Sequence, residues 1–280
     1  MKLNARKVFK MLQNLHTHTN FCDGKNTPEE MIEAAINLGL DSLGFSGHCP
    51  TVCNTDWEMH DHSGYAKKIA ELKEKYAGKI DVYLGTELDY YASTEAFDIK
   101  YDYTIGSVHM LQINGSLIDF DHSAEKTEKH IQQDFGGDSL AYARAYFDLV
   151  ADLPNKLNFD IAGHFDLVTK FSEKHANLID VDAKAYKSIA LEALYAVREK
   201  QELFEVNTGA IAKGLRKKPY PAPFILKEMK ALKCKLVLTS DCHNKNALCC
   251  HFNEAREYIK ACGFDTLYFL GKGGFFGEKL

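Results

Sequence analysis

Apolar and polar residues follow two alternating periods along the chain. Short runs rich in β-branched and aromatic residues are followed by stretches in which apolar residues recur every three or four positions, a pattern that predicts strands followed by amphipathic helices. The first such helix carries clear start signals, with Thr27 as N-cap, Pro28 at the first helical position and Glu30 three residues after the cap. The predicted strands cover residues 10–18, 41–48, 80–90, 101–113, 156–166, 203–209, 234–243 and 265–271, and the predicted helices cover residues 27–40, 63–78, 139–153, 182–200, 222–233 and 246–263.

The order of these elements indicates the fold. A strand followed by a helix and then by another strand is the repeating unit of a parallel sheet. Seven or eight such strands in 280 residues suit a single α/β barrel domain that spans residues 1–280. Asn114 and Gly115 predict a hairpin turn after the fourth strand. Residues 119–138 form the longest polar stretch without periodicity, and we expect either a lid over a substrate or a plain surface excursion there.

Composition narrows the class of protein. Hydrophobic residues make up 45% of the chain and charged residues 26%, and the net charge of −5 does not favour binding to nucleic acid. No apolar run approaches the ~20 residues of a membrane span, and the start of the chain lacks a signal-peptide pattern, so we expect a cytoplasmic protein that binds no membrane. Most of the eight cysteines should be free thiols in that reducing compartment. Nothing in the sequence specifies an oligomeric state.

Polar residues end most of the predicted strands. One such residue after a strand is more often a hydrogen-bonded loop residue than a ligand, but most of the predicted strands finish in histidine, glutamate, aspartate or asparagine. These residues are His16 and His18, His48, Glu87, His109, His164, Asn207, and Asp241 with His243. In a barrel of parallel strands they all point toward one mouth, at the carboxyl ends of the strands. The two members of each pair are two positions apart, so they share one strand face.

This set of side chains predicts a metal centre. Imidazole and carboxylate ligands together favour Zn, Mn or Fe, whereas Ca and Mg prefer oxygen ligands alone. The number of histidines and carboxylates exceeds the needs of one tetrahedral ion, so we expect two to three divalent transition-metal ions. Cys22, Cys49 and Cys242 adjoin proposed ligands, but the chain has no C-x2-C spacing, and we interpret these cysteines as small buried residues rather than as thiolate ligands.

Seven motifs, in this order, resemble one protein family. They read NLHTHTNFCDGKNTPEE, FSGHCP, LGTELDY, YTIGSVH, AGHFDLVTKF, VNTG followed by YPAP, and TSDCH. The chain therefore resembles the polymerase-and-histidinol-phosphatase (PHP) superfamily, and within it the stand-alone histidinol-phosphate phosphatase branch, from residue 14 to about residue 270. The resemblance implies a distorted seven-stranded (β/α) barrel with a trinuclear metal centre at the carboxyl-terminal mouth.

The resemblance also assigns ligands to three ions. They are His16, His18, Glu87 and Asp241 for the first ion, Glu87 as a bridge with His109 and His164 for the second, and His48 and His243 for the third. The chain departs from the family at Asp23, because relatives have a histidine shortly after the HxH motif and this chain reads FCDGK. A carboxylate can bind the same ion, so we expect Asp23 to complete the third site. The alternative is a third site that is weak or empty.

The activity implied by the resemblance is hydrolysis of L-histidinol phosphate to L-histidinol and phosphate in histidine biosynthesis. Metal ions would hold the phosphate oxygens and activate the attacking water, with Glu87, Asp241 and His243 as catalytic residues. The side chains expected to contact this small phosphorylated substrate are Arg216, Lys213, Lys170 and His122. A polar group must also select the imidazole and ammonium groups of the substrate, and the open candidates are Glu95, Asp119, Asp121 and His122.

Two other activities fit part of the pattern. A PHP phosphoesterase could act on another small phosphate ester, such as a nucleotide or a sugar phosphate. An amidohydrolase-like enzyme that cleaves C–N bonds also places HxH on the first barrel strand, but such enzymes commonly use a carboxylated lysine where this chain has Glu87. A non-catalytic accessory domain is disfavoured, because the ligand set is nearly complete.

Overall fold

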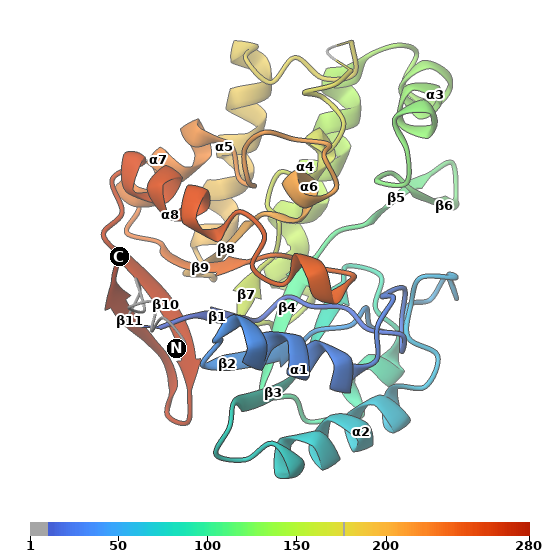
Figure 1. The fold of residues 1–280 in the computed structure, drawn as a ribbon. Coiled ribbons are helices and arrows are strands. Elements are labelled where there is room, and N and C mark those ends of the chain that lie inside the picture. The colour runs from blue at the N-terminus through green and yellow to red at the C-terminus, as the bar shows by residue number, and fades with distance from the viewer. Residues whose placement is uncertain (1–10, 176) are drawn as a thin grey trace.

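Seven strands pair in parallel around a nearly closed barrel in the part of the chain that the structure describes (Figure 1). The structure is a computed structural model that describes residues 11–175 and 177–280, so residues 1–10 and 176 of the expected domain lie outside the described residues. In spatial order the strands are β1 (Gln13–Asn14), β2 (Ser42–Phe45), β3 (Asp81–Asp89), β4 (Tyr103–Ser107), β7 (Ile161–Ala162), β8 (Leu203–Asn207) and β9 (Lys235–Thr239). This spatial order follows the order in the chain, as successive βα units produce. The predicted distorted (β/α)7 barrel is confirmed.

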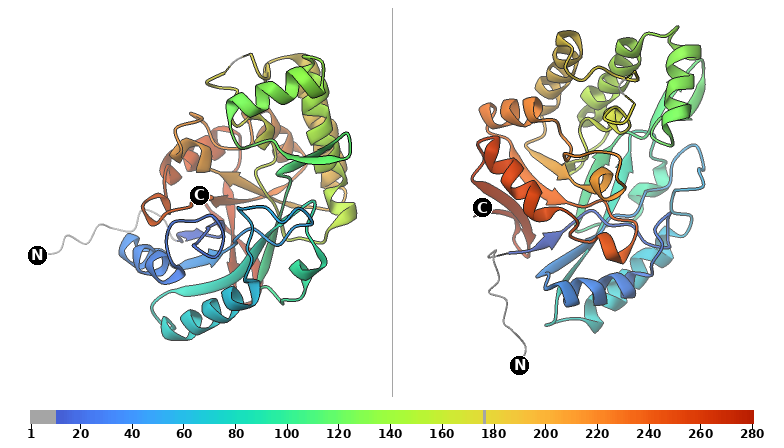
Figure 2. Two further views of the ribbon diagram at one scale, coloured as in Figure 1. Left: turned by 90° about the vertical axis from the view of Figure 1, so that its right-hand side faces the viewer. Right: turned by 45° about the horizontal axis from the view of Figure 1, so that its top comes forward.

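Helices lie around the outside of the strands (Figure 2). The α-helices are α1 (Pro28–Leu38), α2 (His62–Lys75), α3 (Ala124–Asp134), α4 (Ser139–Lys156), α5 (Lys184–Arg198), α6 (Gly209–Ala212), α7 (Pro223–Ala231) and α8 (Phe252–Ala261), and the 3-10 helices are η1 (Thr94–Phe97), η2 (Leu167–Thr169) and η3 (Lys245–Ala247). The predicted start of α1 is confirmed, because the Thr27 side chain accepts a hydrogen bond from the N–H of Glu30 and Pro28 begins the helix. Within the described residues, no helix is both long and apolar enough to cross a membrane.

Two antiparallel hairpins extend this framework. They are β5 (Met110–Ile113) with β6 (Ser116–Asp119), and β10 (Thr266–Gly271) with β11 (Gly274–Lys279). The first hairpin confirms the turn predicted at Asn114 and Gly115, which both have positive φ angles. The second was predicted only in part, because the glycines and charges of β11 hide a strand in the sequence.

The barrel closes between β1 and β9 through few contacts. Near the mouth, Thr17 and Cys242 form an isolated bridge, and the N–H of His18 donates to the carbonyl of Cys242 at 2.9 Å. Away from the mouth, the Gln13 side chain forms hydrogen bonds to the backbone of Leu270, as a neighbouring strand would. Its amide nitrogen donates to the carbonyl of Leu270 at 2.9 Å, and its oxygen accepts from the N–H of Leu270 at 2.8 Å. Gln13 therefore ties β1 to β10, which packs beside β9.

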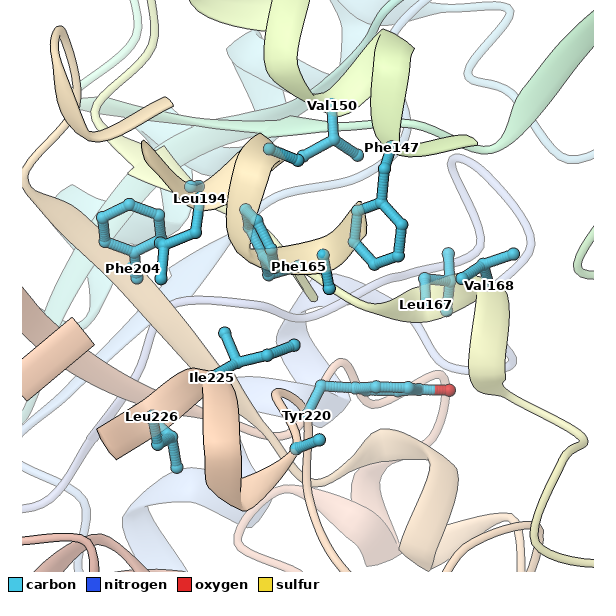
Figure 3. Close-up of a cluster of buried hydrophobic side chains, with 14 of the residues drawn as sticks. Phe147, Val150, Phe165, Leu167, Val168, Leu194, Phe204, Tyr220, Ile225 and Leu226 are labelled. Carbon is cyan, nitrogen blue, oxygen red and sulfur yellow. The ribbon is translucent and has the colours of Figure 1, made fainter. Parts of the chain in front are cut away.

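The largest apolar cluster packs between the outer helices and the strands (Figure 3). Phe165 lies between Phe147 of α4 and Phe204 of β8, with ring centroids 5.8 Å and 6.1 Å away, respectively. Burying an aromatic ring of this size contributes strongly to stability. Phe165 directly follows His164, so the packed ring also fixes the backbone that carries this histidine at the mouth.

The stretch 119–138 is not irregular, which corrects the prediction. β6 ends in it, and α3 begins after Ser123, whose side chain caps the helix. The buried residues of α3 are Ala124, Thr127 and Ile131. This apolar stripe is too thin among the surrounding charges to predict a helix from periodicity.

Other predicted boundaries also move. The helix predicted over 246–263 begins only at Phe252, because His251 has a left-handed φ of 60° that interrupts the helical backbone. The strands are shorter than predicted, and β1 and β7 have two residues each. Most of the polar residues at the mouth therefore follow their strands in loops.

Replacing Gln13 with alanine is expected to destabilise the barrel. Gln13 is buried, so its loss leaves the N–H and the carbonyl of Leu270 unpaired, and an unpaired buried polar group costs about 1–3 kcal/mol. Urea unfolding compares Gln13→Ala with Gln133→Ala, a change at an exposed position of α3. The free energy of unfolding should fall for Gln13→Ala and stay within about 0.5 kcal/mol of the wild type for the control. Equal stabilities of the two variants would contradict the closing role of Gln13.

Candidate metal centre

The predicted metal ligands meet at the carboxyl ends of the strands. Glu87 lies inside β3, and the others follow β1, β2, β4, β7 or β9 within a few residues. The cluster consists of His16, His18, His48, Glu87, His109, His164, Asp241 and His243. Their ligand atoms, with those of Asp23, form four overlapping groups that could each hold a metal ion.

Glu87 occupies the middle of this cluster and is 1% exposed. Its Oε2 atom lies 3.0 Å from Nδ1 of His48 and 3.2 Å from Nε2 of His16. Its Oε1 atom lies 2.9 Å from Nε2 of His164 and 3.3 Å from Nε2 of His109. The two oxygens thus face different histidines, which is the arrangement that a bridging carboxylate requires.

His16, His18 and Asp241 form one of these four groups, and Glu87 Oε2 lies beside both histidines. Nε2 of His16 lies 3.7 Å from Oδ1 of Asp241, whereas Nε2 of His18 lies 3.1 Å from that oxygen and 3.6 Å from Glu87 Oε2. Ligands about 2.0–2.1 Å from a zinc ion in a tetrahedron are about 3.3 Å from one another. The separations of 3.1–3.7 Å between neighbouring atoms are close to that edge length.

Several of these atoms have no hydrogen-bond partner among the described residues. They are Nε2 of His16, Nε2 of His18, Nδ1 of His48 and Oε2 of Glu87, and all are buried. A buried polar atom without a partner is costly. Their mutual proximity therefore fits metal ions as the missing partners.

Asp23 joins the cluster from the loop after β1. Its Oδ2 atom lies 3.1 Å from Nε2 of His243, and its Oδ1 atom lies 3.7 Å from Nε2 of His48. Gly24 allows this approach, because a Cβ atom there would lie 2.5 Å from the backbone of His18. The N–H of Lys25 also donates to the carbonyl of His243 at 2.8 Å, which holds the loop against the β9 end.

Asp241 and His243 are positioned by a turn rather than by alternation along a strand, which corrects the expectation of a shared strand face. β9 ends at Thr239, and Asp241 has a left-handed φ of 47°. Nδ1 of His243 hydrogen-bonds to the carbonyl of Asp241 at 3.0 Å. With Nδ1 as donor, Nε2 is left free to bind an ion.

Glu205 holds groups of the cluster in place through hydrogen bonds, and it was not predicted from the sequence. Its Oε1 atom accepts from Nδ1 of His16 at 2.5 Å and from the Thr239 hydroxyl at 2.6 Å. Its Oε2 atom accepts from the N–H of His164 at 2.7 Å and from the Asn207 amide at 3.0 Å. Because Nδ1 of His16 donates to this carboxylate, Nε2 carries the lone pair that faces the cluster.

Asp89 orients His109 in the way that Glu205 orients His16. Its Oδ2 atom lies 2.9 Å from the backbone nitrogen and 3.2 Å from Nδ1 of that histidine. One signal could have revealed both supporting acids. Glu205 lies between Phe204 and Val206 and Asp89 follows Leu88, so each acid adjoins apolar strand residues, and a buried charge needs a partner of opposite charge or hydrogen-bond donors.

Histidine–carboxylate pairing keeps the acids of the cluster charged. Burial opposes the charge of Glu87, but His16 and His109 hold the pKa of its carboxyl well below the usual range. Burial opposes the charge of Asp241 too, and His16 and His18 keep its pKa well below normal. Burial and neighbouring histidines lower the pKa of His18 to about 3. The charged carboxylates and the neutral His18 are in the protonation states that metal binding requires. Neighbouring carboxylates, Glu87 among them, raise the pKa of His16 and His109 well above the usual value against the effect of burial, so these two imidazoles must lose a proton when they bind an ion.

A cavity of about 250 Å³ opens above the cluster. Outside the metal-binding groups, its lining residues are Trp57, Asp119, Asp121, His122, Leu167, Lys170, Ala210, Lys213 and Tyr220. Three of the four residues expected to contact substrate, His122, Lys170 and Lys213, are among them. The cavity therefore brings cationic and acidic side chains to the space next to the proposed ions.

Arg216 lies elsewhere, which corrects its expected place. Its guanidinium stacks over the ring of Tyr220 at 4.3 Å from the centroid and hydrogen-bonds to the Thr169 hydroxyl. It lines a separate cavity together with Asp166. Arg216 thus supports Tyr220 from the side away from the first cavity.

The cysteines next to the ligands remain thiols. All eight cysteines are free. Burial raises the pKa of Cys22 to about 12 and that of Cys49 well above normal. None of the four metal-binding groups among the described residues contains a cysteine. Cys49 and Cys242 are buried, as interpreted from the sequence, whereas Cys22 is half-buried.

Comparisons with known sequences agree with this geometry. A family model described as PHP domain matches residues 14–209. A protein of Deinococcus radiodurans named "Probable histidinol-phosphatase" is 31% identical over 265 residues, which cover 91% of this chain and 95% of that protein.

Two solved structures have the same fold. HisK from Listeria monocytogenes matches with a TM-score of 0.76 and 25% identity, over 87% of this chain and 99% of that chain. The histidinol phosphate phosphatase of Lactococcus lactis, solved with zinc, L-histidinol and phosphate, matches with a TM-score of 0.72 and 20% identity, over 94% of this chain and 98% of that chain.

Changing Glu205 to glutamine is expected to weaken metal binding. The amide keeps the size of the side chain, but its NH2 group faces donors that bond to a carboxylate oxygen in the wild type, and the charge that orients His16 is lost. Loss of such a supporting partner lowers metal affinity by about 10- to 100-fold. Competition with a chromogenic chelator measures this, and Glu202→Gln, at an exposed position three residues earlier, is the control. If both variants bind metal like the wild type, Glu205 does not orient the ligands.

Proposed function

The chain belongs to the PHP domain family, and we propose that it is a metal-dependent phosphomonoesterase that hydrolyses L-histidinol phosphate to L-histidinol and phosphate. The observation that carries the proposal is the cluster around Glu87, which opens directly into a cavity with both cationic and acidic walls. The name and the near full-length match of the Deinococcus radiodurans relative support this substrate.

We propose that two to three zinc, manganese or iron ions bind at the mouth. From the family resemblance, the ligands would be His16, His18, Glu87 and Asp241 for the first ion, Glu87, His109 and His164 for the second, and Asp23, His48 and His243 for the third. The four groups defined by geometry divide the same residues differently, as His16, His18 and Asp241; His16, Glu87 and His164; His48, Glu87 and His109; and His18, Asp23, His48 and His243. When bound, such ions neutralise phosphate oxygens and make a water molecule nucleophilic at neutral pH. Glu87, Asp241 and His243 are the proposed catalytic residues, because they would hold the ions that face the substrate.

Other side chains of the cavity would orient the ester. Lys170 and Lys213 place positive charge in the wall, where phosphate oxygens can accept hydrogen bonds. His122 also lines the cavity and lies outside the four metal-binding groups found among the described residues. It is therefore free to contact the leaving oxygen of the substrate, to which a proton must be delivered.

We propose that residues 1–280 form one PHP-type domain. The family model ends at residue 209, but β9 pairs in parallel with β8 beyond that point. Asp241 and His243 then enter the metal cluster from the end of β9. A barrel cut at residue 209 would lose both ligands.

The reconstituted protein should hold two to three ions per chain and prefer L-histidinol phosphate. Elemental analysis after loading with Zn, Mn and Fe in turn gives the metal count. Phosphate release then compares kcat/KM for L-histidinol phosphate with the values for nucleotide and sugar monophosphates. A count of one ion or none would overturn the metal assignment, and a higher kcat/KM for a nucleotide or a sugar phosphate would overturn the substrate.

Asp23→Asn should remove one ion and spare the others. The amide keeps the shape of the side chain but weakens the ligand, so the metal count should fall by about one per chain. Loss of a positioned cation near the phosphate should lower kcat by about 10²- to 10³-fold. Asp56→Asn, at an exposed loop position, is the matched control. If metal count and kcat of Asp23→Asn equal those of the control, Asp23 is not a ligand.

A further inference from the structure

We infer that Asp119 binds the ammonium group of the substrate and so selects an amino-alcohol phosphate over phosphate esters without a cation. The inference rests on the proposed function, because it concerns the end of the substrate away from phosphorus. It starts from a carboxylate in the cavity wall that has no cationic partner among the described residues.

The β5–β6 hairpin places Asp119 beside the metal cluster. β5 begins at Met110, directly after His109, and Asp119 lies opposite Met110 in the antiparallel register. Directly opposed Cα atoms in such a pair are about 4.5–5.5 Å apart. The N–H of Phe120 also donates to the carbonyl of His109 at 3.4 Å. The hairpin therefore holds Asp119 close to a proposed ligand, in the wall of the same cavity.

The neighbouring acid, Asp121, is already neutralised. Nζ of Lys170 donates to the Asp121 carboxylate at 2.7 Å and to its backbone carbonyl at 2.8 Å. Asp119 accepts the N–H of Asp121 at 3.1 Å but forms no ion pair with any described lysine, arginine or histidine. Lys170 therefore compensates the charge of Asp121, and Asp119 is left without a cationic partner among the described residues.

The electrostatic setting of Asp119 favours an incoming cation. Burial and the charge of Asp121 raise the pKa of Asp119 above its usual value. A nearby positive charge stabilises the ionised form of such a carboxyl group. The ammonium group of L-histidinol can supply that charge, whereas Lys170 already holds the pKa of Asp121 low against the effect of burial.

The other acids named as candidates from the sequence do not suit binding of the ammonium group. Glu95 lies on η1 and is exposed, outside the cavity lining. Asp23 and Asp241 line the cavity but belong to the proposed metal groups. Trp57 also lines the cavity, with its ring centroid 4.8 Å from that of His48, and would provide an aromatic contact for the imidazole of the substrate.

Substrate analogues separate this inference from the proposed function. The metal-loaded wild type, Asp119→Asn, Asp119→Glu and the exposed control Glu95→Gln are compared on three esters. These are L-histidinol phosphate, the analogue with hydrogen in place of its amine, and p-nitrophenyl phosphate. For Asp119→Asn, kcat/KM should fall by about 10- to 100-fold on L-histidinol phosphate and remain unchanged on the two esters without an amine. Asp119→Glu keeps the charge and should recover part of the loss.

The outcomes are distinct. An equal fall on all three esters, or no fall on L-histidinol phosphate, would overturn the role of Asp119. If instead the wild type hydrolyses p-nitrophenyl phosphate but not L-histidinol phosphate, the proposed function itself fails. The unchanged rate on p-nitrophenyl phosphate, with an unchanged metal count, shows that Asp119→Asn is folded.

Calorimetric titration tests the two ends of the substrate directly. Asp119→Asn should weaken binding of L-histidinol by about 10- to 100-fold, because its amine loses a charged partner. Binding of inorganic phosphate should stay the same, since the proposed metal ligands and Lys213 are untouched. An L-histidinol affinity equal to that of the wild type would overturn the inference.

Discussion

A buried carboxylate among imidazoles is the constraint on which the rest of the structure depends. Glu87 is almost wholly excluded from water, and its ion-pair partners among the described residues are all histidines. A charge in that position is tolerated only with strong compensation. The parallel barrel supplies compensation by bringing the ends of β1, β2, β4 and β7 around Glu87 of β3, so that each of these four strands contributes at least one imidazole.

The histidines themselves are held by a further layer of fixed groups. Glu205 and Asp89 take the Nδ1 hydrogens of His16 and His109, which turns the opposite nitrogens toward Glu87. Phe165 anchors the backbone of His164, the residue before it, through core packing rather than through a hydrogen bond. Two backbone features position other ligands. They are the left-handed φ of Asp241 and the close approach to the backbone of His18 that Gly24 permits. The site is thus positioned by rigid elements, which is how a preorganised centre avoids rearrangement when it acts.

Much of this could be predicted from the sequence, because it follows from periodicity and strand ends. A parallel barrel brings its strand ends together whatever the details of packing, so residues such as His48 and Glu87 could be placed at the mouth. The direction of a long side chain does not follow from strand position, and Arg216 turned away to stack on Tyr220. Glu205 was missed because its role depends on four partners from three other strands and its own. Periodicity also fails for α3, whose buried stripe is narrow.

The sparse junction between the first and last strands of the sheet has a consequence for the whole molecule. β1 and β9 meet through an isolated bridge near the mouth, and Gln13 secures the other end. His18 from one side of this seam faces Asp241 from the other. An ion held by both would act as a cross-link between distant parts of the chain, and a link that closes a long loop removes more conformational entropy from the unfolded state than one that closes a short loop. Binding of ions at the centre would then stabilise the folded barrel and also complete the site for catalysis. Stability against unfolding and catalytic competence would therefore arise from the same event.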